Sequence, residues 1–269
     1  MGPSPERRNP FCGRGLPAWI ALLVLAAAAG GCFCRTKSAI SAIDRSHPAE
    51  MNRSLLGAEG PTRLVVHVEW IEGAAPEDYA LRALRTWLVR ETGRPKASIE
   101  VVRGGVVARE PGEGQAAIEA TVKKYAAPPP DTHFVYVLYW DRWLRYRGVY
   151  FPARELDRRI LHEVVVMFVD PIAAQSVLWL TRRKVEAAVL VHEFGHGAGL
   201  VTNGAHTDGR GHCSNAHCRM YWGVDRRSIR ANLFPVLCRG VLDPGDFCSE
   251  CDADLAAGRT RSLEEPAPP

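Results

Sequence analysis

Short apolar runs and one helical repeat dominate the chain after residue 63. Runs rich in Val, Ile, Leu and Tyr predict strands at 64–70, 99–102, 133–140 and 163–169. Leu81, Leu84 and Leu88 recur at helical spacing, which predicts a helix over 77–91 that ends before Gly93. A weaker helix is expected over 116–125, before three prolines. This pattern predicts an α+β domain.

A further apolar run, 187–191, predicts a buried helix that continues into His192-Glu193-Phe194-Gly195-His196. Residues four apart lie one above the other on a helix, so His192 and His196 can offer two imidazoles to one zinc ion. Glu193 projects from nearly the same face, where it can take a proton from a zinc-bound water. The motif therefore predicts a zinc peptidase with Glu193 as the general base. The glycines of this segment are expected to end the helix: Gly195, Gly197 and Gly199.

Three other histidines are expected to have no metal role. His162-Glu163 begins like a second zinc motif, but Val166 stands where a second histidine would be needed. The pair is therefore expected at the start of a strand. His67 and His133 are likewise expected to be strand residues.

The segment that follows must supply a third metal ligand. The motif with Gly199 resembles that of the metzincin zinc peptidases, in which the third ligand follows this glycine by three residues. Thr202 occupies that position and is a poor zinc ligand. His206 and His212 are the alternatives in the polar, glycine-rich segment that follows, with Asp208 as a carboxylate alternative.

The sequence His212-Cys213, followed by Cys218 and Met220, resembles the archaemetzincins, in which a ligand histidine precedes C-x4-C-x-M. This resemblance covers 189–220, with a looser match through Leu255. It implies that His212 is the third ligand and that residues 202–211 are an inserted loop. It also implies that Met220 is the methionine of the Met-turn beneath the metal.

Four cysteines form two short pairs that can meet: Cys213, Cys218, Cys248 and Cys251. The resemblance implies that they hold a second, structural zinc ion, and such short hooks suit a tetrahedral thiolate site. Disulfides are the alternative, because the N-terminus indicates export to an oxidising compartment. Cys238 is left over in either scheme, and the alternatives for it are a buried thiol, a free thiol or a pair with Cys34.

The N-terminus resembles a bacterial lipoprotein signal. Arginines precede an apolar stretch, 16–29, and small residues precede Cys32. The interpretation is a signal peptide over 1–31, lipidation of Cys32, and a polar tether over 32–62 that leads to the domain. Phe33 rather than Asp follows the cysteine, which favours the outer membrane of a bacterial envelope over the inner membrane.

Charge gives no sign of a nucleic-acid partner. The net charge is +4, and residues 1–31 carry three arginines and one glutamate, so their removal leaves +2. Short basic runs such as 182–184 are expected to be solvated faces.

The expected whole is a lipid-anchored zinc metallopeptidase that hydrolyses peptides or proteins. The resemblance implies a metzincin fold over 63–259, with a twisted mixed sheet, an active-site helix and a small C-terminal subdomain, and a disordered tail is expected over 260–269. The alternative function is a non-catalytic zinc-binding envelope lipoprotein used in adhesion or partner binding. Thr202 in the ligand position favours this alternative, whereas an intact Glu193 argues against it.

Overall fold

The computed structural model describes residues 55–56, 61–142, 146–153, 156–157, 159, 162–174, 181–201, 206–209, 211–215, 218–221 and 247–264. All of them belong to one compact unit. The expectations for the signal peptide, Cys32, Cys34, Thr202 and Cys238 lie outside these residues, as does most of the tether. In the part that is described, no helix is long and apolar enough to cross a membrane.

The centre of the domain is a mixed five-stranded sheet. Its strands are β1 Arg63–Ile71, β2 Ile99–Val107, β3 Thr132–Trp140, β4 Gly148–Phe151 and β5 Glu163–Phe168, in the order β2-β1-β3-β5-β4. Neighbouring strands are parallel except β4, which is antiparallel to β5. The central strand β3 is buried on both faces, which explains its almost continuous apolar sequence. The four expected strands are confirmed, and β4 is an additional one.

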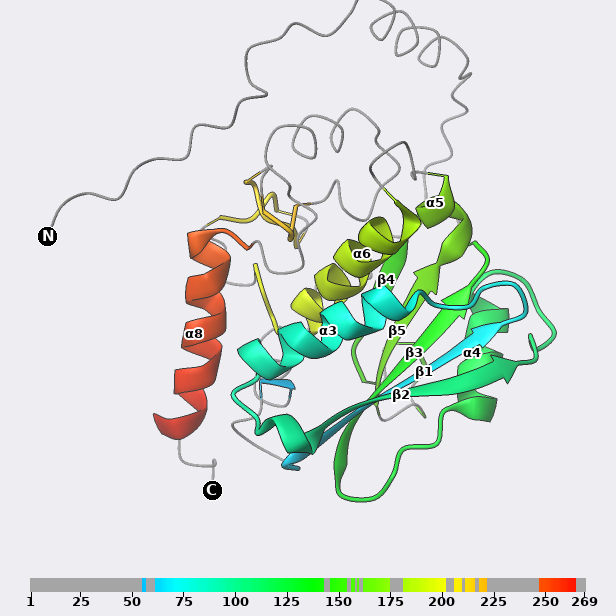
Figure 1. Ribbon diagram of the computed structural model, residues 1–269, viewed down its shortest axis with the longest axis horizontal. Helices are drawn as coiled ribbons and strands as arrows, with labels where there is room; N and C mark the ends of the chain where they lie inside the picture. Colours follow the sequence, from blue (N-terminus) through cyan, green and yellow to red (C-terminus); the bar gives the residue numbers. More distant parts are fainter. Residues whose placement is uncertain are drawn as a thin grey trace, which may run out of the picture. The chain divides into compact units, whose positions relative to one another are not determined.

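Several helices accompany the sheet. They are α3 Asp78–Glu91, α4 Gln115–Tyr125, α5 Val169–Ala173, α6 Arg182–Gly197 and α8 Ser249–Glu264, with a short 3-10 turn at Lys96–Ser98. Figure 1 shows α3 and α6 side by side in front of the sheet and α4 behind it. Right-handed crossovers require this arrangement, because β1-α3-β2 and β2-α4-β3 run in opposite directions across the sheet. The predicted α+β class with a mixed sheet and a metal-motif helix is confirmed.

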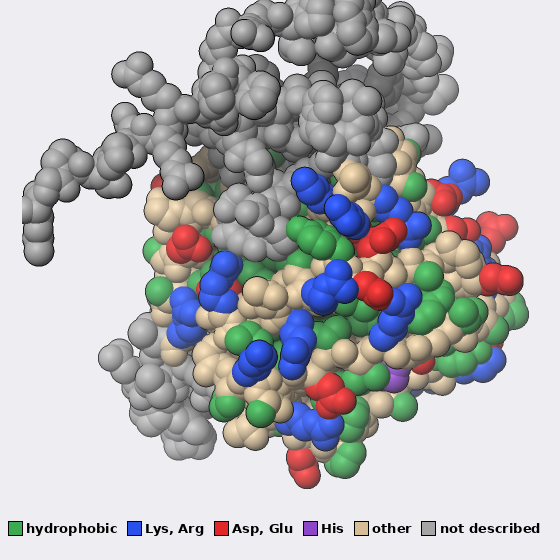
Figure 2. All heavy atoms as spheres, viewed as in Figure 1, with side chains coloured by type: hydrophobic (Ala, Val, Ile, Leu, Met, Phe, Trp, Pro, Cys, Tyr) green, Lys and Arg blue, Asp and Glu red, His purple; other side chains and the backbone are tan. Residues whose placement is uncertain are grey.

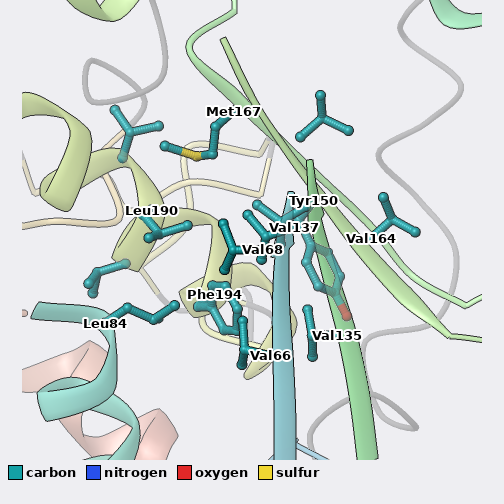
Figure 3. Close-up of a cluster of buried hydrophobic side chains, with 14 of the residues drawn as sticks. Val66, Val68, Leu84, Val135, Val137, Tyr150, Val164, Met167, Leu190 and Phe194 are labelled. Carbon is teal, nitrogen blue, oxygen red and sulfur yellow. The ribbon is translucent and has the colours of Figure 1, made fainter. Parts of the chain in front are cut away.

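The apolar side of α6 fixes the metal motif against the sheet. Leu190 and Phe194 pack towards Val66 and Val68 of β1, and Leu84 of α3 closes the same cluster (Figure 3). Phe194 lies between the two motif histidines in sequence and is fully buried. Because a helix turns by about 100° per residue, seating Phe194 on the sheet turns His192 and His196 away from it.

A fully buried carboxylate joins α6 to the start of α3. The main-chain N–H of Glu77 donates a hydrogen bond of 2.8 Å to Glu186 Oε1, and Arg182 Nε lies 3.5 Å from Glu186 Oε2. Burial raises the pKa of Glu186 to about 7. The carboxylate therefore ties the two helices together at the cost of its own desolvation.

The exposed face over α3 carries mixed charge. Figure 2 shows Lys and Arg side chains spread over this face with Asp and Glu among them. Arg103 pairs with Asp78, and Arg90 pairs with Glu91. The expectation that the protein binds no nucleic acid stays a prediction.

Candidate metal centres

Helix α6 places two imidazoles at metal-binding distance. His196 Nε2 lies 3.1 Å from His192 Nε2. Two nitrogens on one tetrahedral zinc ion, each about 2.05 Å from the metal, would lie roughly 3.3 Å apart. The pair therefore already has the spacing that a zinc ion requires.

His212 completes a three-histidine group, here called the imidazole cluster. Its ring centroid lies 5.4 Å from that of His192 and 5.1 Å from that of His196. One ligand nitrogen from each of the three rings lies within 4.8 Å of the others, so the group can hold a metal ion. Of the three candidates for the third ligand, the structure brings His212 to the helix.

The other two candidates lie elsewhere. Asp208 braces the loop that carries His212, because its Oδ1 accepts the His212 N–H at 3.2 Å and its own N–H donates to the His212 carbonyl at 2.7 Å. His206 Nε2 lies 3.4 Å from Cys251 Sγ and 3.5 Å from an oxygen of Asp254. Neither Asp208 nor His206 belongs to the imidazole cluster.

Hydrogen bonding and burial prepare the imidazoles for a metal. His192 Nδ1 donates to the main-chain carbonyl of Arg219 at 2.7 Å, so Nε2 is the ring atom that can act as the metal ligand. Burial lowers the pKa of the His196 imidazole well below its usual value, and the neighbouring rings of His192 and His212 lower it further. A neutral imidazole is the form that binds zinc.

Strand β4 lies against the carboxylate of Glu193. The Glu193 side chain is buried, and a Cβ atom added to Gly148 would lie 2.6 Å from its Oε1. Only a glycine lets the strand pass this close. Neither β4 nor Gly148 was expected from the sequence, and no local signal points to them, because a strand of four residues has no recognisable periodicity.

Two motif glycines lie at close packing contacts. The expectation that Gly195 ends the helix is wrong, since α6 continues past it, whereas Gly197 is the last residue of α6. A Cβ on Gly195 would lie 2.4 Å from Met220 Sδ, and one on Gly197 would lie 2.8 Å from Tyr150 Cε2. Gly199, with φ of +75°, is the glycine that takes the left-handed conformation after the helix.

Met220 is fully buried under α6 and in contact with the motif. Its carbonyl accepts the N–H of Cys213 at 2.8 Å, which holds the segment after His212 beneath the helix. Met220 thus contacts Gly195 of the motif, and its role as the methionine of a Met-turn stays a prediction.

The four cysteines Cys213, Cys218, Cys248 and Cys251 form a second group, here called the cysteine cluster. Sulfur–sulfur distances are 3.6 Å for Cys213–Cys248 and 3.5 Å for Cys218–Cys251, and all four sulfurs lie within 4.8 Å of one another. A disulfide needs about 2.05 Å, whereas two thiolates on one tetrahedral zinc ion would lie roughly 3.8 Å apart. All four are free thiols, and their spacing suits a metal rather than disulfides.

The electrostatics of the cysteine cluster favour a bound cation. The hydrogen bond from Cys251, aided by main-chain N–H groups, lowers the pKa of Cys218 to about 6. Burial raises the pKa of Cys213 to about 12 and also raises that of Cys248, while donation to Cys218 raises that of Cys251. Cys218 is thus stable as a thiolate by itself, whereas the other three thiols need a nearby positive charge to lose their protons.

Like His206, three more histidines of the described residues lie outside both clusters. His67 is on β1 and His133 on β3, where His133 Nε2 lies 3.4 Å from Glu163 Oε2. Glu163 begins β5, directly after His162, as expected. Among the described residues, none of these histidines joins a three-ligand group.

No protein-family model matches the chain, and no curated protein matches it. Among solved structures, the crystal structure of archaemetzincin from Methanopyrus kandleri is similar to this chain, with a TM-score of 0.46 and 15% sequence identity. That similarity covers 76% of this chain and 97% of the other. The function is therefore inferred from the geometry of the two clusters.

Proposed function

We propose that this protein is a zinc-dependent metallopeptidase with a metzincin-type active site. The observation that carries the proposal is the convergence of His192, His196 and His212, with the buried Glu193 next to His192 on the same helix. Three neutral imidazoles are a common ligand set for zinc and leave a fourth position open for water or substrate. A structural site would instead be closed by a fourth protein ligand.

The chemistry divides between the metal and Glu193. A zinc ion held by the imidazole cluster would supply Lewis acidity to a water molecule and to the scissile carbonyl. A carboxylate oxygen of Glu193 accepts a proton as the water oxygen attacks the carbonyl carbon. The same oxygen then donates this proton to the amide nitrogen as the C–N bond breaks. His192 keeps its orientation during these steps because its Nδ1–H is held by the Arg219 carbonyl.

The position of β4 supports a peptide as the substrate. In the sheet formed by the described residues, β4 is an edge strand, paired with β5 alone. An edge strand offers main-chain N–H and C=O groups to an extended chain. Because Gly148 of β4 lies against Glu193, a peptide bound along this edge would pass the general base.

The cysteine cluster is proposed to hold a second, structural zinc ion. Its four sulfurs form a closed ligand set with no position left for substrate. Main-chain N–H groups of Asn215 and Met220 point at the sulfurs of Cys213 and Cys218, each at 3.4 Å. Such hydrogen bonds to ligand sulfurs are typical of outer-shell support in metal sites.

Hydrolysis of a mixed peptide library by the purified full-length chain tests the proposed activity. Cleavage sites are identified by mass spectrometry, and Glu193→Gln is the matched control, since it keeps the shape of the side chain and the imidazole cluster. The expected result is cleavage by the parent alone, with equal zinc content in both proteins. Zinc in both proteins with no cleavage by either would refute the peptidase and favour the non-catalytic zinc-binding lipoprotein.

A further inference from the structure

The two clusters are joined by consecutive residues of the chain. His212 directly precedes Cys213, so one peptide bond joins the residues that carry the third imidazole and the first thiol. Arg219, whose carbonyl orients His192, directly follows Cys218. Two of the three imidazoles therefore depend on main chain that the cysteines hold in place.

A second connection runs through side chains of α8. Asp254 Oδ2 accepts the N–H of Val201 at 3.0 Å and lies 3.5 Å from His206 Nε2, which is itself 3.4 Å from Cys251 Sγ. Val201 has φ of +65°, a conformation that a β-branched residue rarely adopts, and it lies just after the end of α6. The cysteine cluster, His206 and Asp254 thus reach the end of the helix that carries His192 and His196.

His206 is also tied to the segment between the clusters. Its carbonyl accepts the N–H of Ser214 at 2.7 Å, and Thr207 forms an isolated β-bridge with Cys213. The described part of the inserted loop therefore packs on the cysteine cluster.

We propose that the two clusters bind metal cooperatively: a cation in the cysteine cluster organises the imidazole cluster, and His206 with Asp254 forms one of the connections. Four thiols without a cation have little reason to converge, and the segments that carry His212 and the Arg219 carbonyl then lose their anchor. With a cation bound, α8 and the loop are clamped together and the imidazoles meet. The inference rests on the proposed function only in assuming that the imidazole cluster takes a divalent ion.

The test uses two metals on the metal-free full-length chain. Cd²⁺ is the probe for the cysteine cluster because soft thiolates prefer it, and Co²⁺ is the probe for the imidazole cluster, followed by its visible absorption. Coupled sites typically change each other's affinity by about 5-fold to 150-fold. We expect the imidazole cluster to bind Co²⁺ at least about tenfold more tightly in Cd²⁺-loaded parent protein than in Cys251→Ser.

A reciprocal measurement covers the case in which Cys251→Ser fails to fold. Thermodynamic linkage requires that filling the imidazole cluster strengthen Cd²⁺ binding by the same factor. Cd²⁺ affinity is therefore compared between the parent and His196→Gln in the same excess of Co²⁺, so that competition at the thiolates is equal. Equal Cd²⁺ affinities, or an undiminished Co²⁺ affinity in folded Cys251→Ser, would overturn the proposal.

The role of His206 is tested by two substitutions of graded severity. His206→Ala should reduce the coupling factor, whereas His206→Gln, which keeps an N–H donor, should restore part of it. His67→Gln, on β1, is the control and should leave the factor unchanged. If His206→Ala has the same coupling factor as the parent, His206 is not part of the connection. None of these measurements uses peptide hydrolysis, so failure of the coupling and failure of the peptidase are separate outcomes.

Discussion

Replacing Gly148 by alanine is a direct test of the contact between β4 and the general base. Gly148 is not among the glycines with positive φ, so the backbone can accommodate alanine. The new Cβ would lie 2.6 Å from Glu193 Oε1, 2.7 Å from Glu193 Cγ and 2.9 Å from Val189 Cγ1. The effect of the substitution is therefore steric, and it acts on Glu193 first.

The expected loss follows from the size of this overlap. An ordinary non-bonded contact needs about 3.4 Å, so either the carboxylate or the strand must move by roughly 0.8 Å. A misplacement of about 1 Å at a catalytic group can lower a rate by roughly 100-fold. We expect kcat to fall by about 10-fold to 100-fold. Zinc content should not change, because the close neighbours of the new Cβ are Glu193 and Val189.

The assay is steady-state hydrolysis of a peptide identified in the library experiment, with metal analysis of the same samples. Gly105→Ala is the matched control: it is also a glycine in a strand, and a Cβ there meets nothing within 4 Å. Its kcat should equal that of the parent. A zinc-loaded Gly148→Ala with parental kcat would refute the reasoning, since Glu193 would then tolerate displacement that a general base cannot.

Four further outcomes are expected. Because burial raises the pKa of Glu186 from 4.5 to about 7, its contribution to stability is fully present below about pH 4.5 and is lost as the pH rises through 7. In urea unfolding, the unfolding free energy of Glu186→Gln relative to that of the parent should therefore rise by roughly 3 kcal/mol between pH 4.5 and pH 8. A difference that does not change with pH would contradict this. Gly195→Ala, whose Cβ overlaps Met220 Sδ, should lower the unfolding free energy by about 1–3 kcal/mol, and Met220→Ala in the same chain should recover part of the loss in Tm. Removal of the metal by a chelator should make the cysteine cluster reactive towards a thiol reagent. Disulfide-bonded cysteines would not react with the reagent before or after chelation. Cys32→Ser should remove the protein from the membrane fraction and the lipid from its mass; retention of both would disprove lipidation at this residue.

The elements that depend on local pattern could be predicted. Central strands such as β3 are apolar along their length because they are buried on both faces, and α3 repeats leucines on its buried side. Strand β4 could not be predicted, since its four residues gain their structure from pairing with β5. Helix α8 continues to Glu264, past residue 259, where the domain was expected to end.

In the candidate site, too, the residues that depend on local pattern could be predicted and those that depend on contacts across the fold could not. The helical spacing of His192 and His196 predicts their convergence, because it depends only on helix geometry. The choice between His206 and His212 could not be made from the residues of the loop, since both lie in the same polar segment. Which histidine joins His192 and His196 depends on hydrogen bonds across the fold, such as that from Cys213 to Met220. The resemblance to the archaemetzincins favoured His212 only because of the cysteines and the methionine that follow it in the sequence.

The group that orients His192 is a main-chain carbonyl, that of Arg219. Every amino acid carries this acceptor, so random substitution at position 219 cannot delete it. Over evolutionary time the residue can drift while the imidazole stays aligned, provided that the loop keeps its path. Insertions or deletions in 213–220 are a different matter, because they would shift the carbonyl itself. The Arg219 side chain is itself fully buried, so the replacements expected to be tolerated at this position are those that keep the path of the loop, and changes in loop length are expected to be tolerated least.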